Sequence, residues 1–490
     1  MNPKFDIPTE ITTITKTLEN KGYLAYLVGG CVRDLMIGRE PKDWDITTNA
    51  KPEEIISLFD KTIYENRFGT VTIVNKETNK ESLGQVEVTP FRTEATYSDK
   101  RHPDEVTFSD KLEDDLKRRD FTINALSYRE KDNSIVDLYD GIKDIKDKTI
   151  RAVGQPAERI SEDPLRILRA IRLSVELGFM INRDLKQAIK ENVHLLKDIS
   201  VERIRNEVSR ITESAQPKDG YLLMAETGVL KQIMPELSAA IGVGQNKNHI
   251  YDVWEHSLRA MQHAANRNWP LVIRLAALFH DIGKPKTKRR DNEKGDYTFY
   301  GHEVVSARLT EKILTRLKFP TKETMLIVKL VRNHMFFSDI EQITLSAVRR
   351  IISKVGPEAV WDLMKVRACD RIGMGRPKEN PYRLRKYESM IDEALRDPTS
   401  VGMLKIDGND LIKLLNVKPG PKIGFILHAL LDEVLTDPTK NKAEYLQAKA
   451  EELAKLTNDE LKELGESGKQ EKNKKEAEEL AKIRKKHGVR

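Results

Sequence analysis

The sequence has few of the features that would place it in a membrane or outside the cell. Its 490 residues include only two cysteines, Cys31 and Cys369, which make neither a disulfide framework nor a cysteine metal cluster. A reducing cytoplasm is therefore the expected location. The best candidate for a membrane span, LVIRLAALF, is interrupted by Arg274 and falls short of the roughly 20 residues required. The N-terminus has no basic segment followed by an apolar one, so no signal peptide is expected.

A strong excess of one charge is also missing from most of the chain. The net charge is +7, but residues 468–490 hold nine Lys/Arg and four Asp/Glu, which leaves about +2 for the rest. The overall charge is therefore weak evidence for a nucleic-acid partner, and a basic surface must be argued from motifs. A hydrophobic content of 39% and a charged content of 33% are typical of a helix-rich soluble protein.

The length predicts two to four domains, and the pattern predicts an α+β fold. Strand and helix signals alternate over the first ~140 residues, whereas helical patterns dominate from about residue 143 to 460. We expect strands at 24–28, 44–46, 70–74 and 85–89, and helices at 31–36 and from Pro52 to residue 59. The last 30 residues are rich in Lys and Glu and are expected to be a solvated helix or a disordered tail.

Three acids in the first half of the chain predict a metal site. Asp43 and Asp45 flank Trp44 on an expected strand, so their side chains would share one face. Glu87 lies between Val86 and Val88 and would face away from the core, where it could complete a three-carboxylate cluster. Such acids suit Mg²⁺ shared with substrate phosphates, and the alternative is a solvated strand edge.

A glycine turn upstream of these acids predicts phosphate binding. Gly29 and Gly30 end an expected strand and open a helix, and Arg33 follows in its first turn. Backbone N–H groups at such a turn bind phosphate, and an arginine fork adds to this. A lone Gly-Gly turn is weak evidence, but its combination with Asp43 thirteen residues after Gly30 is more specific.

Three stretches together are specific enough to resemble a known family. LVGGCVRDLMIGREPKDWDITTNA, KRRDFTINAL at 117–126 and ERISEDPLRILRAIRL at 158–173 resemble motifs of the tRNA nucleotidyltransferase and bacterial poly(A) polymerase family, in the DNA polymerase β superfamily. The resemblance covers about residues 20–215. It implies that Asp43 and Asp45 are the metal ligands. The residues that it assigns to the ribose and phosphates are Arg118, Arg119, Asp120 and Asn124.

The third stretch has a physical interpretation as a base-selecting motif. CTP and ATP share an amino donor beside a ring-nitrogen acceptor, which a carboxylate and an arginine can read together. UTP and GTP present the reverse pattern, which would leave polar groups unpaired. Asp163 and Arg166 lie three apart at an expected helix start, and the resemblance gives them this role. The alternative is that Asp163 only caps the helix. Arg169 and Arg172 suit phosphates or RNA, or surface ion pairs.

The segment at 93–106 bears on which family member this is. In the family, a flexible loop there accompanies addition of the terminal A, so its presence argues against an enzyme that adds only CC. It does not separate a full CCA-adding enzyme from an A-only enzyme. The EDPLR stretch favours a tRNA substrate over poly(A) polymerase activity.

A second constellation lies further along the chain. The pair His280-Asp281 ends an apolar helix. For Lys284, which follows, a surface position is expected, and the alternative is contact with a substrate phosphate. Imidazole and carboxylate groups on helices bind divalent metals. The order of these residues resembles the HD phosphohydrolase superfamily, which implies a divalent metal and hydrolysis of 2′,3′-cyclic or 2′-phosphate ends of RNA. The full set is His256, His280, Asp281, His302, His334 and Asp370.

The combined prediction is a Mg²⁺-dependent enzyme that adds CCA to tRNA from CTP and ATP and has no membrane association. The oligomeric state stays open. Rival interpretations are an A-only enzyme, a poly(A) polymerase, an HD phosphohydrolase whose head only docks RNA, and a non-catalytic tRNA-binding protein. The expected domains are a nucleotidyltransferase head (1–140), a neck (141–215), an HD-type domain (216–375), a helical tRNA-binding region (376–460) and the tail (461–490).

Overall fold

The computed structural model confirms a mixed α+β fold that is 59% helical with a small mixed sheet. Two compact units are present, one formed by residues 1–332 with 372–375 and the other by 333–371 with 376–490. No helix among the described residues is long and apolar enough to cross a membrane. The residues that the structure describes are 4–65, 69–75, 78–94, 106–246, 250–291, 295–336, 345–395, 402, 404–457, 460–461 and 487.

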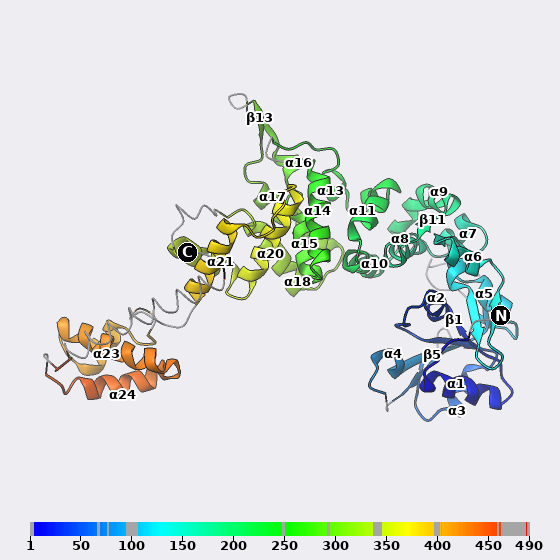
Figure 1. Cartoon of the computed structure of the whole chain (residues 1–490), viewed down its shortest axis with the longest axis horizontal. Coiled ribbons are helices and arrows are strands. Elements are labelled where there is room, and N and C mark those ends of the chain that lie inside the picture. Colours follow the sequence, from blue (N-terminus) through cyan, green and yellow to red (C-terminus); the bar gives the residue numbers. More distant parts are fainter. Residues whose placement is uncertain are drawn as a thin grey trace. The chain divides into compact units, whose positions relative to one another are not determined.

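The head is built on a seven-stranded sheet with the order β3-β4-β5-β2-β1-β8-β9. Figure 1 labels its strands β1 and β5. Pairing is antiparallel except between β2 and β5, which run parallel and place Asp45 opposite Glu87. Val86 and Val88 are buried and Glu87 is exposed, as the alternation predicts. The strands are β1 Ala25–Val28, β2 Asp45–Thr48, β3 Thr62–Glu65, β4 Thr70–Val74, β5 Gln85–Pro90, β8 Leu126–Arg129 and β9 Ser134–Asp137.

Short helices and a small hairpin complete the head. Gly30 begins the helix after β1, one residue before the expected start, and Pro52 begins the next helix as expected. The predicted loop at 93–106 has its ends in the hairpin, but its residues 95–105 lie outside the described part. The elements are α1 Thr9–Asn20, α2 Gly30–Met36, α3 Pro52–Leu58, α4 Glu81–Gly84, β6 Arg92–Glu94, β7 Val106–Phe108, α5 Leu112–Lys117, η1 Thr122–Asn124 and α6 Gly141–Lys146.

A helical neck follows, with one helix buried on almost all sides. In α8 (Arg166–Leu177) the apolar residues are buried, and so are the polar residues Arg166, Arg172 and Ser174. Gly178 ends this helix in a left-handed conformation, which favours glycine. The other elements are β10 Thr149–Ile150, α7 Pro156–Glu162, β11 Met180–Ile181, α9 Arg183–Asn192, η2 Val193–Asp198, α10 Val201–Glu213, α11 Pro217–Glu226, α12 Val229–Ile233 and α13 Pro235–Ser238.

The rest of the first unit consists of helices and one small hairpin. The helix that contains LVIRLAALF is buried from Ile273 to Phe279, so this run is a core helix. A hairpin, β12 with β13, separates it from the next long helix (Figure 1). The elements are α14 Val253–Asn266, α15 Leu271–Phe279, α16 Lys284–Thr287, β12 Arg289–Asp291, β13 Asp296–Thr298, α17 His302–Arg316 and α18 Thr321–Asn333.

All secondary-structure elements in the described residues of the second unit are helices. One apolar core there is formed by Leu411, Leu430, Leu446 and their neighbours. Most of the predicted tail at 461–490 lies outside the described residues. The elements are α19 Leu345–Val355, α20 Ala359–Gly373, α21 Tyr382–Leu395, α22 Gly408–Leu415, α23 Pro421–Thr436, η4 Pro438–Lys440 and α24 Ala443–Leu453.

Candidate active site

The turn between β1 and α2 is held in a geometry that requires glycine. Gly29 has φ of 81°, and its N–H donates to the carbonyl of Leu126 at 3.1 Å. A Cβ at Gly29 would lie 2.9 Å from a guanidinium nitrogen of Arg119 and 3.7 Å from a carboxylate oxygen of Asp45. The positive φ favours glycine, and a side chain here would also displace the guanidinium of Arg119. The backbone of this turn therefore lies close to both the guanidinium of Arg119 and the carboxylate of Asp45.

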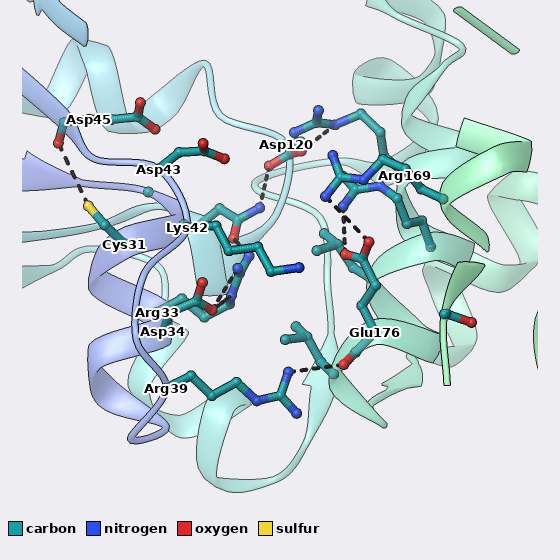
Figure 2. Close-up of a pocket in the computed structure, with 18 of the residues that line it drawn as sticks. Cys31, Arg33, Asp34, Arg39, Lys42, Asp43, Asp45, Asp120, Arg169 and Glu176 are labelled. Atoms are coloured by element: carbon teal, nitrogen blue, oxygen red, sulfur yellow. Dashed lines mark hydrogen bonds and ion pairs between the residues drawn. The ribbon is translucent and has the colours of Figure 1, made fainter. Parts of the chain in front are cut away.

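Asp43 and Asp45 line the same cavity as Gly29 and Gly30, and Figure 2 shows the two acids near Cys31. The cavity has a volume of about 690 Å³. The strand begins at Asp45, so the expectation that both acids lie on one strand is wrong. Asp43 lies in the bend before β2, because pairing with β5 starts only at the Asp45–Glu87 position. Glu87 is next to Asp45 in the sheet, but the residues that line the cavity do not include it.

The electrostatics of Asp45 fit a cation site. Burial raises the pKa of the Asp45 carboxyl, the negative charge of Asp43 raises it further, and Arg119 opposes both effects. A desolvated carboxylate beside a second acid is stabilised when a divalent cation lies between them. Cys31 also lines the cavity, but burial raises the pKa of its thiol to about 12, so it stays protonated and is no nucleophile.

A hydrogen-bonded chain crosses the cavity from the head to the neck. Arg33 donates to the side-chain oxygen of Asn124 at 2.7 Å, and Asn124 donates to Asp120 at 3.1 Å. Asp120 also accepts two bonds from Arg169 on α8, at 2.9 and 2.6 Å. Burial opposes ionisation of Asp120, but the Arg169 guanidinium outweighs it and holds the pKa of that carboxyl well below its usual range. Four predicted nucleotide-binding residues are thus joined in one network.

The other predicted arginines are paired with acids. Arg172 lines the cavity and donates to Glu207 on α10 and to Glu176, both at 2.7 Å. Arg119 also lines it and pairs with Asp115 at 3.0 Å. Arg118 pairs with the same carboxylate at 2.5 Å and is not among the residues that line the cavity. The assigned role of Arg118 therefore stays a prediction.

The predicted base-selecting pair does not lie on one helical face. Asp163 lies between α7 and α8, and α8 begins only at Arg166. The argument from helical spacing is therefore wrong, and so is the simple N-cap alternative, although Asp163 accepts a bond from the N–H of Leu165 at 3.0 Å. Its other oxygen accepts from Arg203 at 2.8 Å.

Arg166 is buried and makes its contacts within the protein. It donates to Glu162 at 2.6 Å, to the Arg159 carbonyl at 2.8 Å and to the Arg118 carbonyl at 3.1 Å. Neither Asp163 nor Arg166 is among the residues that line the described cavity. Base selection by this pair stays a prediction.

Several charged residues that sequence reasoning missed line the same cavity. Arg39 donates to the backbone carbonyl of Glu176 at 3.0 Å, which joins the head to the end of α8 (Figure 2). Glu176 also accepts from Arg210 at 3.3 Å. Only the spacing of Arg172 and Glu176, four apart on a helix, was a readable signal. The missed charged lining residues are Asp34, Arg39, Glu40, Lys42, Glu176, Arg210 and Glu213.

A second cluster of titratable groups is buried in the first unit. The Nε2 atoms of His256 and His280 are 2.9 Å apart, and one oxygen of Asp281 lies 3.1 and 3.3 Å from them. The other oxygen lies 3.2 Å from Nε2 of His302. Nδ1 of His280 is 2.7 Å from the Ala277 carbonyl, which as a donor would leave Nε2 its lone pair. This donor set fits a divalent metal.

Lys284 belongs to this cluster, so its expected place on the surface is wrong. It is 5% exposed, and its ammonium lies 2.6 Å from both Asp281 and the side-chain oxygen of Gln245. The helical turn α16 directs it inward because it starts three residues after Asp281. His334 and Asp370 are buried residues of the second unit, and their part in a metal site stays a prediction.

Known proteins match this chain along most of its length. Family models match residues 25–151 (Poly A polymerase head domain), 178–241 (probable RNA and SrmB-binding site of polymerase A) and 253–375 (HD domain). The CCA-adding enzyme of Lactobacillus helveticus is 33% identical, with 91% of this chain and 98% of that protein covered. That of Limosilactobacillus reuteri is 34% identical, with 90% and 96% covered.

Solved structures agree with these matches. The Bacillus stearothermophilus CCA-adding enzyme in complex with CTP has 28% identity and a TM-score of 0.57, and the match covers 91% of this chain and 98% of that one. The Thermotoga maritima CCA-adding enzyme complexed with tRNA, at 20% identity and a TM-score of 0.51 over 90% and 94% of the chains, shares the fold. The fold of the head, the cavity and the matches to known proteins together identify this chain as a nucleotidyltransferase with an HD domain. The chain belongs to the family of CCA-adding enzymes.

Proposed function

We propose that this chain rebuilds the 3′ CCA end of tRNA by successive transfer from CTP and ATP, with release of pyrophosphate. One observation carries the proposal: Asp43 and Asp45 share a cavity with the glycine turn and with the Arg33–Asn124–Asp120–Arg169 network, in a chain whose relatives are CCA-adding enzymes over nearly their whole length. The tRNA 3′-hydroxyl would attack the α-phosphate of the nucleotide, and pyrophosphate would leave.

Asp43 and Asp45 are the residues that would hold Mg²⁺. When bound, the ion supplies charge neutralisation for the triphosphate and activation of the attacking hydroxyl. The raised pKa of Asp45 supports this role, because an acid that is costly to ionise in the empty site gains most from a cation. Glu87, exposed beside Asp45, is the third candidate ligand.

The rest of the cavity would hold the nucleotide. The turn at Gly29 and Gly30 and the guanidinium of Arg33 suit the triphosphate. Arg119, Asp120 and Asn124 have fixed orientations, because each is hydrogen-bonded to a neighbour, and such fixed donors and acceptors orient a ligand without further ordering.

Asp163 and Arg166 are proposed to read the shared amino and ring-nitrogen edge of CTP and ATP. Each side chain holds protein partners that a base would have to replace or share. Uptake of UTP or GTP as readily as ATP would rule out this selection.

The test uses tRNA transcripts that end before CCA or after CC. Each is offered CTP and ATP, separately and together, with Mg²⁺, and product ends are sequenced. Full CCA addition on the first transcript supports the proposal. Addition of A only to the CC-ended transcript identifies an A-only enzyme, and long A tails identify a poly(A) polymerase. Retained activity in Asp43→Ala would show that incorporation does not depend on this site.

The second cluster supports an additional activity. Three histidines and Asp281 present ligand atoms close together, and Lys284 adds a cation suited to a phosphate ester. We propose that this site binds a divalent metal and hydrolyses 2′,3′-cyclic or 2′-phosphate ends of RNA. Metal analysis of the purified protein should show an ion that His280→Ala loses, with hydrolysis lost in parallel. Equal metal content in both proteins would contradict the site.

A further inference from the structure

The C-terminal end of α10 is held by side chains from the helices that carry the second cluster. The last turn of a helix leaves backbone carbonyls without partners. Here Arg274 on α15 donates from one nitrogen to the carbonyls of Thr212 and Ser214, at 3.0 and 2.8 Å. Its Nε donates to the Trp269 carbonyl at 2.8 Å, and this third hydrogen bond fixes the orientation of the guanidinium.

A second anchor comes from the neighbouring helix α14. Gln262 donates to the carbonyl of Ala215 at 2.9 Å and accepts from the N–H of Lys218 at 3.2 Å. Gln262 lies six residues after His256, and Arg274 lies six residues before His280. The two helices that present these histidines therefore also fix the end of α10.

Helix α10 lines the nucleotide cavity at its C-terminal end, and earlier in the helix it holds residues of the neck through ion pairs. Near its start, Arg203 donates to Asp163, and further on Glu207 accepts from Arg172. Its last turn and the two residues after it form a wall of the cavity, so any shift of this end changes the cavity directly. The cavity-lining residues at this end are Arg210, Glu213, Ser214 and Ala215.

A buried guanidinium is unfavourable unless it is hydrogen-bonded, so Arg274 would be a poor side chain for a role in packing alone. It is 7% exposed, and burial lowers the pKa of its guanidinium, which shows that the charged form is penalised there. Ser214, which ends α10, has φ of −61° and ψ of 167°, so the helix lacks the left-handed residue that commonly satisfies such carbonyls. The rigid fork of an arginine satisfies two of them and fixes their direction.

We propose that Arg274 is a positioning residue for nucleotide addition. Through the last turn of α10 it sets the wall of the nucleotide cavity, so the HD-type helices take part in nucleotide binding independently of any hydrolysis. This rests on the proposed nucleotide addition at the cavity.

The test compares Arg274→Met, Arg274→Lys and the exposed-site control Arg308→Met on α17. Steady-state kcat and KM for CTP and ATP are measured on tRNA lacking CCA, with the melting temperature of each variant. Arg274→Met should raise KM for both nucleotides about five- to thirty-fold, the range that one to two kcal/mol of lost positioning gives. Arg274→Lys should recover part of the loss, and Arg308→Met should stay within about twofold.

The possible outcomes separate this inference from the proposed function. A folded Arg274→Met protein with unchanged KM values overturns the role of Arg274, and so does a change in stability alone. If Arg274→Met does not fold, Gln262→Ala is the deciding variant, with the same rise in KM expected on a smaller scale and an unchanged KM refuting the inference. A wild-type protein that adds no nucleotides would instead refute the proposed function.

Discussion

Replacing Asp45 by asparagine should abolish nucleotide addition and stabilise the metal-free protein at the same time. The substitution keeps the side-chain size and removes one charge. A carboxylate that holds a catalytic metal contributes several kcal/mol to the transition state, and about 4 kcal/mol corresponds to about a thousandfold in rate. Burial and the charge of Asp43 raise the pKa of Asp45, so its ionised form is strained without a cation. Removing that strain should add about 1 kcal/mol of stability.

The pH dependence of this gain has a defined sign. Because the folded-state pKa of Asp45 is raised, its ionisation costs nothing below the unfolded pKa of about 3.9 and costs most above the folded pKa. The stability advantage of Asp45→Asn should therefore grow as pH rises from about 4 and vanish below it. Denaturant unfolding at pH 4 to 8 measures the free energy of unfolding of the wild type and of Asp45→Asn. Samples with EDTA give the metal-free stability, and samples with Mg²⁺ give the contribution of the metal. Mg²⁺ should stabilise the wild type more than the variant.

Either of two results would refute this reasoning. The first is a variant that incorporates CTP within tenfold of the wild-type rate, because a metal ligand cannot be lost so cheaply. The second is a variant that is less stable than the metal-free wild type at pH 7, because the Asp45 carboxylate would then be favourable without a cation. Asp6→Asn, at an exposed head position away from the cavity, is the control and should change neither quantity.

Other substitutions test the scaffold. Arg316 binds Glu236 through two bonds at 2.7 and 2.8 Å and lowers the pKa of that carboxyl to about 2. Glu236→Gln should cost about 1–2 kcal/mol at pH 7, discounted for the partly exposed arginine, and this difference should disappear as pH falls from 4.5 towards 2, measured by urea unfolding. Gly283→Ala would place a Cβ 2.6 Å from the His302 carbonyl, so it should destabilise by about 1–3 kcal/mol and lower metal content. Gly29→Ala should cost about 1–3 kcal/mol, because φ of 81° with ψ of −132° is a conformation that residues with a side chain rarely adopt, and it should raise the KM for nucleotides. A melting temperature unchanged within error would contradict either glycine prediction.

Local pattern was sufficient to predict much of the head. Alternation placed Val86 and Val88 inside, and the Gly-Gly turn marked the end of β1, because backbone conformation there depends on adjacent residues. It failed at Asp43, since a strand begins where a partner strand allows pairing. The residues of β2 do not show where its partner strand β5 lies in space.

Long-range contacts of arginine side chains could not be predicted from the sequence, for a different reason. Arg203 contacts Asp163 across 40 positions, and Arg274 contacts Thr212 across 62. In each case the sequence shows only a charged residue on a helix, for which a solvated position is the common outcome. Lys284 shows the same difficulty at short range, because its burial depends on the acid and the amide that surround it in space.

The arrangement of α10 changes how the two sites are to be understood. Arg274 donates to one carbonyl beside its own helix, that of Trp269, but its other two hydrogen bonds go to Thr212 and Ser214 at the end of α10, which lines the other cavity. A displacement of one end of α10 would therefore be transmitted to the other end through the helix backbone and through these hydrogen bonds. The proposed hydrolysis and the anchoring of α10 can be tested separately, because His256 and His280 each lie six residues from an anchor, Gln262 and Arg274 respectively. The helices would remain necessary for nucleotide addition even in a chain whose second site had lost its metal.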